Sequence, residues 1–180
     1  VAARAYLVAK AADPAVPVDV RWEAMRGVVP TGDEQPERPV YFEASDYDQI
    51  VAAVAFAAEF KLRAIVVGGR DAWLCAELLK KHHIPVIVNS VLLMPKRDDS
   101  AYDEVYQLPK KLHEAGVTFC LASGEETPHE RNLPYAAAMA VAYGLDPVAA
   151  LKAVTLWPAQ ILGVEASLGS IEVGKSATLI

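Results

Sequence analysis

Four short apolar runs, rich in Val and Ile, alternate with helix-forming segments through the middle of this 180-residue chain. The runs occupy residues 40–44, 63–67, 85–89 and 117–122, and helices are predicted at 46–60, 71–82 and 101–115, with a further one from Asn132. Ser45 and Asp48 predict a capped start for the first helix, and Pro109 predicts a kink or break in the third. Strands that are apolar throughout are typical of parallel sheets buried on both faces. The alternation therefore predicts an α/β fold with a parallel sheet.

The two ends of the chain carry different patterns. A helix near residues 2–11 and a proline-rich connector precede the sheet. Toward the other end, Asp146-Pro147 predicts a helix start, Trp157-Pro158 a break and Gly163 a helix stop. The residues after Gly163 read as a turn, a strand, a second turn and a second strand, still apolar at the last residue. The predicted domain limits are 1–39, 40–163 and 164–180.

Composition excludes several classes of partner. A net charge of −6, without any cluster of Lys or Arg, argues against nucleic acid and anionic membranes as partners. The apolar stretch at 50–60 is too short to span a bilayer. Cys75 and Cys120 lie in apolar surroundings, which predicts buried thiols rather than a disulfide. Nothing in the sequence indicates a cellular location.

Parallel α/β sheets place their chemistry beyond the carboxyl ends of the strands. The residues predicted there are 43–45, 68–71, 89–90 and 123–126. Gly68-Gly69 fits neither the dinucleotide fingerprint nor the P-loop, so a tight turn is the favoured interpretation. Ser123 lacks the flanking glycines of a nucleophile elbow. Glu43 is open to two interpretations, as a metal ligand or base, or as a solvated carboxylate at the rim.

One loop combines a histidine with several carboxylates. His129 lies close in sequence to Glu125, Glu126 and Glu130, after the fourth strand. Such a loop can bind a divalent cation, but it has no second histidine nearby. A metal site and a solvated loop both remain open here.

A longer ordered string of residues points to a family. It consists of Pro-Tyr-Ala-Ala-Ala-Met-Ala at 134–140, Ala-Leu-Lys-Ala-Val-Thr at 150–155, Pro-Ala at 158–159, Leu-Gly at 162–163 and Leu-Gly-Ser-Ile-Glu-Val-Gly-Lys at 168–175. In this order the string resembles the amidohydrolase superfamily, and within it the imidazolonepropionase-like branch. Segments at 65–69, 84–88 and 115–117 extend the resemblance back to about Val40.

The resemblance implies a distorted (β/α)8 barrel, similar to a TIM barrel, with a small β-sandwich beside it. The four predicted strands would be the fifth to eighth of the barrel, and residues 169–180 would return toward the sandwich. Roughly the first half of the family's chain, including the metal-binding histidine pair of strand one, would then lie outside this sequence. Active members hydrolyse non-peptide C–N bonds with a divalent metal such as zinc.

This sequence departs from the family at the metal ligands. Active members add a histidine at the end of strand five, another at strand six, and an aspartate at strand eight that takes a proton from the attacking water. By strand order, the strand-five position falls at Glu43 and the strand-six position at Gly68 or Gly69. The strand-eight position falls at Ser123 or Gly124, or at Glu125 if the alignment shifts by a residue. The resemblance therefore implies membership with degenerate metal-ligand positions.

Three hypotheses follow. The favoured one is the C-terminal half of an amidohydrolase-like protein, inactive as this chain and holding no metal or other cofactor. The second is a working metal-dependent hydrolase with unusual ligands such as Glu43, Glu125 and His129, completed by the missing half. The third is a metal-free binding or interaction domain.

Two further predictions concern ligands and assembly. If a small-molecule substrate binds, Arg70, Arg131 and Asn132 are the predicted contacts to its carboxylate. Four strands cannot close a barrel, which needs about eight. Open apolar edges recruit other strands, so we expect either a homodimer or pairing with the missing N-terminal half.

Overall fold

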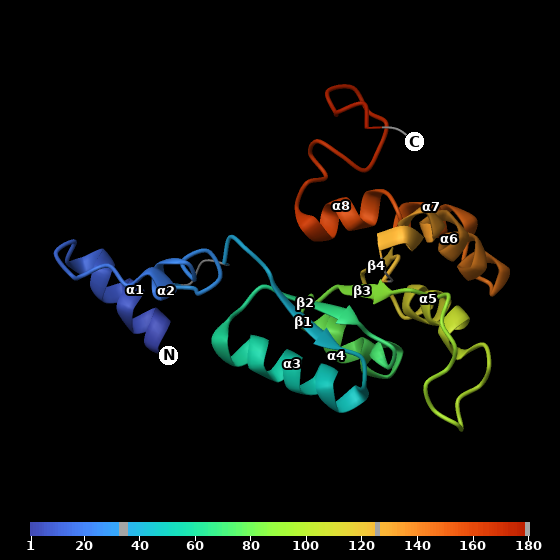
Figure 1. Cartoon of the computed structure of the whole chain (residues 1–180), viewed down its shortest axis with the longest axis horizontal. Helices are drawn as coiled ribbons and strands as arrows, with labels where there is room; N and C mark the ends of the chain where they lie inside the picture. The colour runs from blue at the N-terminus through green and yellow to red at the C-terminus, as the bar shows by residue number, and fades with distance from the viewer. Residues whose placement is uncertain (33–35, 125–126, 179–180) are drawn as a thin grey trace.

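A parallel four-stranded sheet forms the centre of the protein, as predicted. The computed structural model describes residues 1–32, 36–124 and 127–178, and at 127–129 it describes the backbone alone. The strands are β1 (Val40–Ala44), β2 (Ala64–Gly68), β3 (Val86–Asn89) and β4 (Phe119–Ala122). They lie side by side in chain order, each parallel to its neighbour (Figure 1).

Helical segments connect the strands and follow the last of them. Between the strands lie α3 (Tyr47–Phe60), the 3-10 turn η1 (Ala72–Cys75) with α4 (Ala76–Lys81), and α5 (Glu104–Glu114). After β4 come η2 (Thr127–Asn132), α6 (Leu133–Ala142), α7 (Pro147–Ala153) and α8 (Leu156–Leu162). This arrangement of strand and helix repeats is consistent with part of a TIM barrel.

The sheet has one face covered by helices and one that is partly open. Phe42, Val66, Val86 and Phe119 lie next to one another across the sheet and join the main core with residues of α3 to α7. On the other face, Ile161 of α8 packs with Ile65 of β2 and Cys120 of β4, and the half-buried Ile87 of β3 lies against them. Figure 1 shows α8 on the opposite side of the sheet from α3 and α4. Beside the covered part, Tyr41 of β1 is 48% exposed.

Two helix boundaries differ from the prediction. The cap of α3 is Asp46 rather than Ser45, and the Gln49 side chain accepts the backbone N–H groups of Ser45 and Asp46 at 3.0 and 3.2 Å. Pro158 does not break a helix, because it lies in the first turn of α8, where the backbone N–H has no intrahelical acceptor. The start of α7 is confirmed, since Asp146 accepts the backbone N–H of Ala149 at 2.9 Å.

The region before the sheet contains α1 (Ala2–Ala12) and the short α2 (Val20–Glu23). Arg4 fastens α1 to the body by donating Nη2 to the carbonyl of Phe60 at 2.9 Å. Of the helices in the described residues, none has the length and apolarity needed to cross a membrane.

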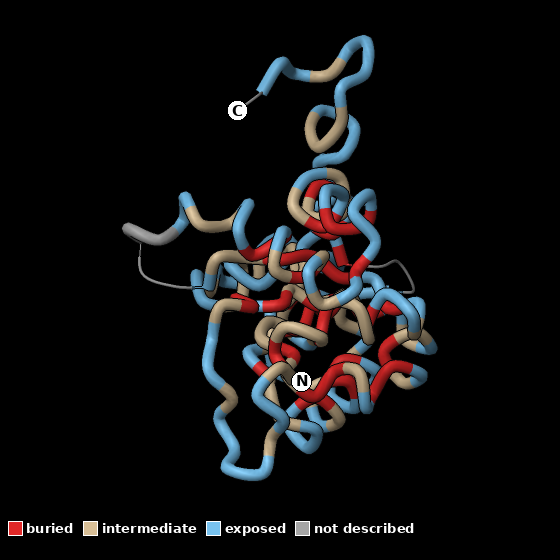
Figure 2. Tube along the Cα trace, turned by 90° about the vertical axis from the view of Figure 1, so that its right-hand side faces the viewer, coloured by how far each residue is buried: buried red, intermediate tan, exposed pale blue. Residues whose placement is uncertain are grey.

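The described part of the C-terminal segment, residues 164–178, does not form the predicted strands, and residues 179–180 of the last one lie outside the described residues. Within 164–178 the structure contains turns, closed by a bond of 3.0 Å from the Ser176 N–H to the Ser167 carbonyl. Figure 2 shows this part as a mostly exposed tube extending from the body. A strand needs a neighbouring strand to satisfy its backbone groups, and no described strand lies beside this segment. The division into three domains stays a prediction.

Candidate functional site

The polar residues predicted to mark a site do meet at one edge of the sheet. The parallel register aligns Ala44 with Gly68, Gly68 with Val88, and Val88 with Leu121. All four strands therefore end together, and the residues that follow them share the carboxyl edge. This is the edge at which α/β folds build their sites.

The end of β2 is built from glycines that leave no room for a side chain. Gly68 and Gly69 have φ of +105° and +67°, in the region that favours glycine. A Cβ on Gly68 would lie 2.5 Å from Oγ of Ser45, below the 3.0 Å that real Cβ atoms keep, and a Cβ on Gly69 would overlap Val86. A ligating histidine cannot occupy either position in this backbone.

The residues at the end of β4 likewise leave no room for a side chain at Gly124. Gly124 has φ of +63°, and a Cβ there would overlap Oδ1 of Asn89 and lie 2.8 Å from the Asn89 carbonyl carbon. Its neighbour Ser123 is partly buried and offers only a hydroxyl. The two described positions that were predicted to match a strand-eight aspartate therefore carry no carboxylate, and Gly124 could not accept one.

The three weak metal candidates are not brought together by the described residues. Glu43 is exposed on the partly open face of the sheet, beside Val67. Glu125 lies outside the described residues, and the side chain of His129 is not described. Among the described residues, no three of His, Cys, Asp and Glu gather as metal ligands do. The described residues by themselves thus do not assemble the three protein ligands that a catalytic zinc normally has.

Four charged side chains form a compact cluster at this edge. Arg97, from the loop between β3 and α5, donates Nη1 and Nη2 to the two carboxylate oxygens of Asp71 at 3.1 and 2.5 Å. Its Nη2 also lies 3.0 Å from Oδ1 of Asp46, and Arg70 donates Nη2 to that same oxygen. Two cations and two anions balance, so the cluster itself is neutral.

Asp71 is the buried centre of this cluster. Its side chain is 2% exposed, and it also accepts the backbone N–H of Tyr47 at 3.0 Å. Burial opposes ionisation of the carboxyl, but the bonds from Arg97 and Tyr47 and the nearby arginine charges outweigh it, so the pKa of Asp71 lies below its usual value. The sequence places Asp71 among the strand-end residues but does not predict its pairing with Arg97. The signal available was an aspartate followed directly by the apolar residues 72–75, which predicts a buried carboxylate in need of a partner.

A hollow of about 230 Å³ opens beside the cluster, at the same edge. Its polar lining includes Ser45, Arg70, Asn89, Lys96 and Glu104. Of the three predicted substrate contacts, Arg70 thus lies at a hollow. Arg131 is exposed and Asn132 precedes α6, and neither lines the part of this hollow that the structure describes.

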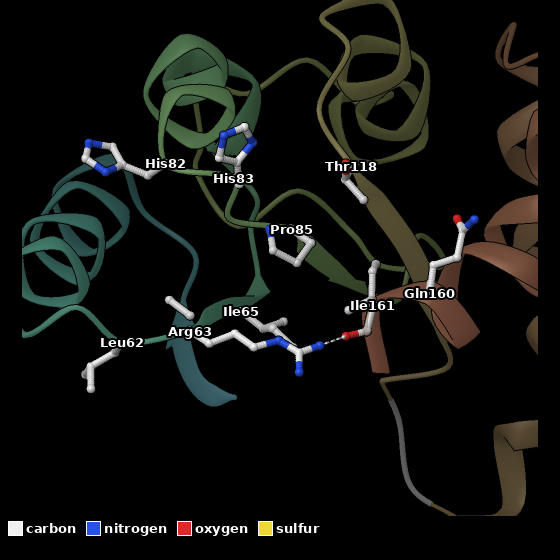
Figure 3. A pocket seen from close by; sticks show the side chains of 10 residues that line it. Leu62, Arg63, Ile65, His82, His83, Pro85, Thr118, Gln160 and Ile161 are labelled. Atoms are coloured by element: carbon white, nitrogen blue, oxygen red, sulfur yellow. Dashed lines mark hydrogen bonds between the residues drawn. The ribbon is translucent and has the colours of Figure 1, made fainter. Parts of the chain in front are cut away.

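A second hollow, of about 370 Å³, lies at the opposite, amino edge of the sheet. Figure 3 shows Arg63 crossing it to donate Nη2 to the carbonyl of Ile161, a bond of 3.2 Å. His82 and His83, from the end of α4, also line it. Because this edge holds the amino ends of the strands, the bond from Arg63 is better explained as an anchor for α8 than as part of a site.

Comparison with known families gives a clear assignment. The sequence model of the amidohydrolase family matches residues 42–180, which is most of the chain. The chain belongs to the amidohydrolase family. The resemblance predicted from the ordered string of C-terminal residues is thereby confirmed at the level of the family. No curated protein matches the chain.

Solved structures agree with this assignment. An amidohydrolase from Thermotoga maritima MSB8 superposes with a TM-score of 0.78 and 27% identity, over 95% of this chain and 43% of that one. A Xaa-Pro dipeptidase with bound methionine gives 0.51 and 18%, over 74% and 42%. A zinc-bound adenosine deaminase from Xanthomonas campestris gives 0.50 and 21%, over 78% and 36%. The last two show a shared fold alone, and this amidohydrolase chain spans less than half the length of each of the three.

Proposed function

We propose that this chain supplies the C-terminal half of an amidohydrolase-like protein, contributing barrel strands five to eight, and that its own residues do not complete a hydrolytic site. The observation that carries the proposal is the backbone at the ends of β2 and β4. There, at Gly68, Gly69 and Gly124, positive φ and close neighbours exclude side chains where active members hold metal and base.

The chemistry explains why these positions matter. Hydrolysis of an amide-type C–N bond at neutral pH needs a nucleophilic water, which a metal provides by lowering the pKa of that water. Such a metal normally needs three protein ligands and an open position. A residue that takes the proton from the water must also lie within hydrogen-bond reach. Of the described positions that strand order matches to the family's ligands, Glu43 alone carries a side chain suited to either role.

Glu43 also supports a second candidate function. Its exposed carboxylate lies on the sheet face that α8 leaves partly open. A complete protein could use Glu43 as one ligand, together with residues that this chain does not contain. The substrate would then be a small molecule with a hydrolysable C–N bond, by resemblance to the family.

The test is metal content together with turnover. The purified 180-residue chain is dialysed against zinc or manganese, freed of excess metal and analysed for bound metal, then assayed with N-acyl amino acids, dipeptides and imidazolone-type rings. We expect no stoichiometric metal and no turnover above background. About one tightly held metal per chain, lost in Glu43→Gln but kept in the control Glu59→Gln, would overturn the proposal and favour the second candidate.

A further inference from the structure

The hollow at the carboxyl edge combines opposite charges that do not neutralise each other. Lys96 comes from the loop after β3, and Glu104 begins α5; both line the hollow, yet they form no ion pair with each other. The neighbouring cluster of two arginines and two aspartates already balances its own charge. The hollow is therefore left with one cationic and one anionic group of its own.

Two buried polar atoms in its lining also lack partners. Arg70 uses Nη2 for Asp46, but its Nε, a hydrogen-bond donor, is buried without an acceptor. Oε2 of Glu104, an acceptor, is buried without a donor. Buried polar groups are nearly always paired, so an unpaired donor and an unpaired acceptor on two residues that line one hollow call for an explanation. The terminal torsion of glutamate is soft, so rotation about it would let Oε2 turn toward a donor held in the hollow.

The remaining lining is apolar. It includes Val88, Leu93, Met94, Val105 and Leu108. A volume of about 230 Å³ holds about eight waters at roughly 30 Å³ each, below the range of pockets for drug-sized ligands. The ligand that complements this lining is thus small, carries one anionic and one cationic group, and has an apolar portion.

We propose that the carboxyl-edge hollow binds a small apolar α-amino acid in its zwitterionic form. Its carboxylate lies at Lys96 and Arg70, its ammonium group at Glu104, and its side chain against Leu93 and Met94. Arg97 is a positioning residue for this site, because its bonds to Asp71 hold the loop that carries Lys96 and Met94.

Three probes of similar size separate the contributions of the two charges. L-leucine carries both, L-leucinamide lacks the carboxylate, and 4-methylpentanoate lacks the ammonium group. Binding to the 180-residue chain is measured by titration calorimetry and mapped by NMR chemical shifts. We expect saturable binding of L-leucine, with the largest shifts around residues 88–96, and affinities at least about tenfold weaker for the other two probes.

Variants assign each charge to its residue. Lys96→Gln should weaken L-leucine and 4-methylpentanoate, each by about tenfold. Glu104→Gln should weaken L-leucine by about the same factor and leave 4-methylpentanoate unchanged. Lys81→Gln and Glu59→Gln are the matched controls, because they make the same charge changes in the last turns of α4 and α3, at the opposite edge.

Four results would overturn the inference. They are no saturable binding of L-leucine, equal affinity for the three probes, equal weakening by the control variants, and shifts confined to the amino edge. None of these measurements requires turnover or metal. Bound metal or hydrolysis would overturn the proposed function instead, so the two failures can be told apart.

Discussion

Arg97 and Asp71 form a two-pronged ion pair, with Nη1 3.1 Å from Oδ1 and Nη2 2.5 Å from Oδ2. The side chain of Asp71 is 2% exposed and that of Arg97 is 41% exposed, so the pair connects a buried carboxylate to a solvent-accessible loop. A planar guanidinium matches a carboxylate in this geometry, whereas the point charge of a lysine does not. The pair fixes where the loop after β3 lies relative to the end of β2.

The first prediction concerns stability and pH at Asp71. Its pKa in the folded chain lies below the value of about 3.9 expected after unfolding. The stabilisation is therefore fully present above about pH 4 and is lost as the pH falls through the lower, folded-state pKa. We expect Asp71→Asn to reduce the free energy of unfolding at pH 7 by about 1–3 kcal/mol and to flatten its dependence on pH below 4.

Urea denaturation from pH 7 to pH 3 measures this effect. Asp98→Asn is the control, because Asp98 is exposed in the same loop as Arg97. An unchanged slope below pH 4 in Asp71→Asn would show that the ion pair does not contribute in this way.

The second prediction tests the closed end of β4. Gly124→Ala and Gly116→Ala both place a side chain at positive φ, +63° and +71° respectively. A Cβ at Gly116 meets nothing closer than 3.8 Å, whereas at Gly124 it overlaps Asn89. We expect a loss of about 1–2 kcal/mol at Gly116 from the backbone conformation alone, and about 1–3 kcal/mol more at Gly124. Equal losses of unfolding free energy in chemical denaturation would mean that the backbone at Gly124 shifts to make room for a side chain. A metal-ligating side chain could then be accommodated at that position.

The third prediction concerns the two thiols. Cys75 in η1 and Cys120 in β4 are free and each 4% exposed, as expected from their apolar surroundings. Burial raises the pKa of Cys120 to about 12, and it raises that of Cys75 as well. At pH 8 only about one Cys120 thiol in ten thousand is ionised, so both should react with a disulfide reagent far more slowly in the folded chain than in urea. Rapid labelling of one thiol per native chain would contradict this.

The fourth prediction is self-association. β1 and β4 are the two edges of the described sheet, and Tyr41 is exposed on the face that α8 leaves partly open. We expect the isolated chain to form dimers at micromolar concentration, and Tyr41→Lys to weaken them, because charges on edge strands oppose pairing. Tyr135→Lys, at a residue 67% exposed on α6, is the matched control. A stable monomer in light scattering would contradict this prediction and would show that other parts of the same chain cover the edge strands.

Local patterns were enough to place the strands, and they were less reliable at boundaries. The first strand was predicted at its observed limits, since Val40, Tyr41 and Phe42 all favour strands and a helix cap follows at residues 45–46. The cap of α3 was misplaced by one residue, because Ser45 and Asp46 both suit a cap and the local sequence does not show after which of them the helix begins. Pro158 was read as a break because its position within a helical turn depends on where the helix begins.

The edge of the sheet that carries the candidate site was predicted, but the contacts between its side chains were not. Topology alone places the strand ends at one edge, which is why Arg70 could be singled out. The pairing of Asp71 with Arg97, by contrast, spans 26 residues and depends on the path of a loop that no periodicity describes. Likewise, a glycine at position 124 suggests from the sequence that the backbone adopts positive φ there. The sequence does not show that Asn89 lies so close that a side chain at position 124 would overlap it, because this contact forms only when the strands pack side by side.

The bond from Arg63 to the Ile161 carbonyl connects residues that are 98 positions apart. Pairing of each strand with the next closes short loops, whereas the bond from Arg63 to α8 closes a long one, and its entropic cost falls only once the strands between them have paired. Folding should therefore proceed by addition of one strand–helix unit after another, with α8 joining last. By the same reasoning, α8 should be the first helix of the main body to detach during partial unfolding, and its amides should exchange with solvent before those of β2 and β3.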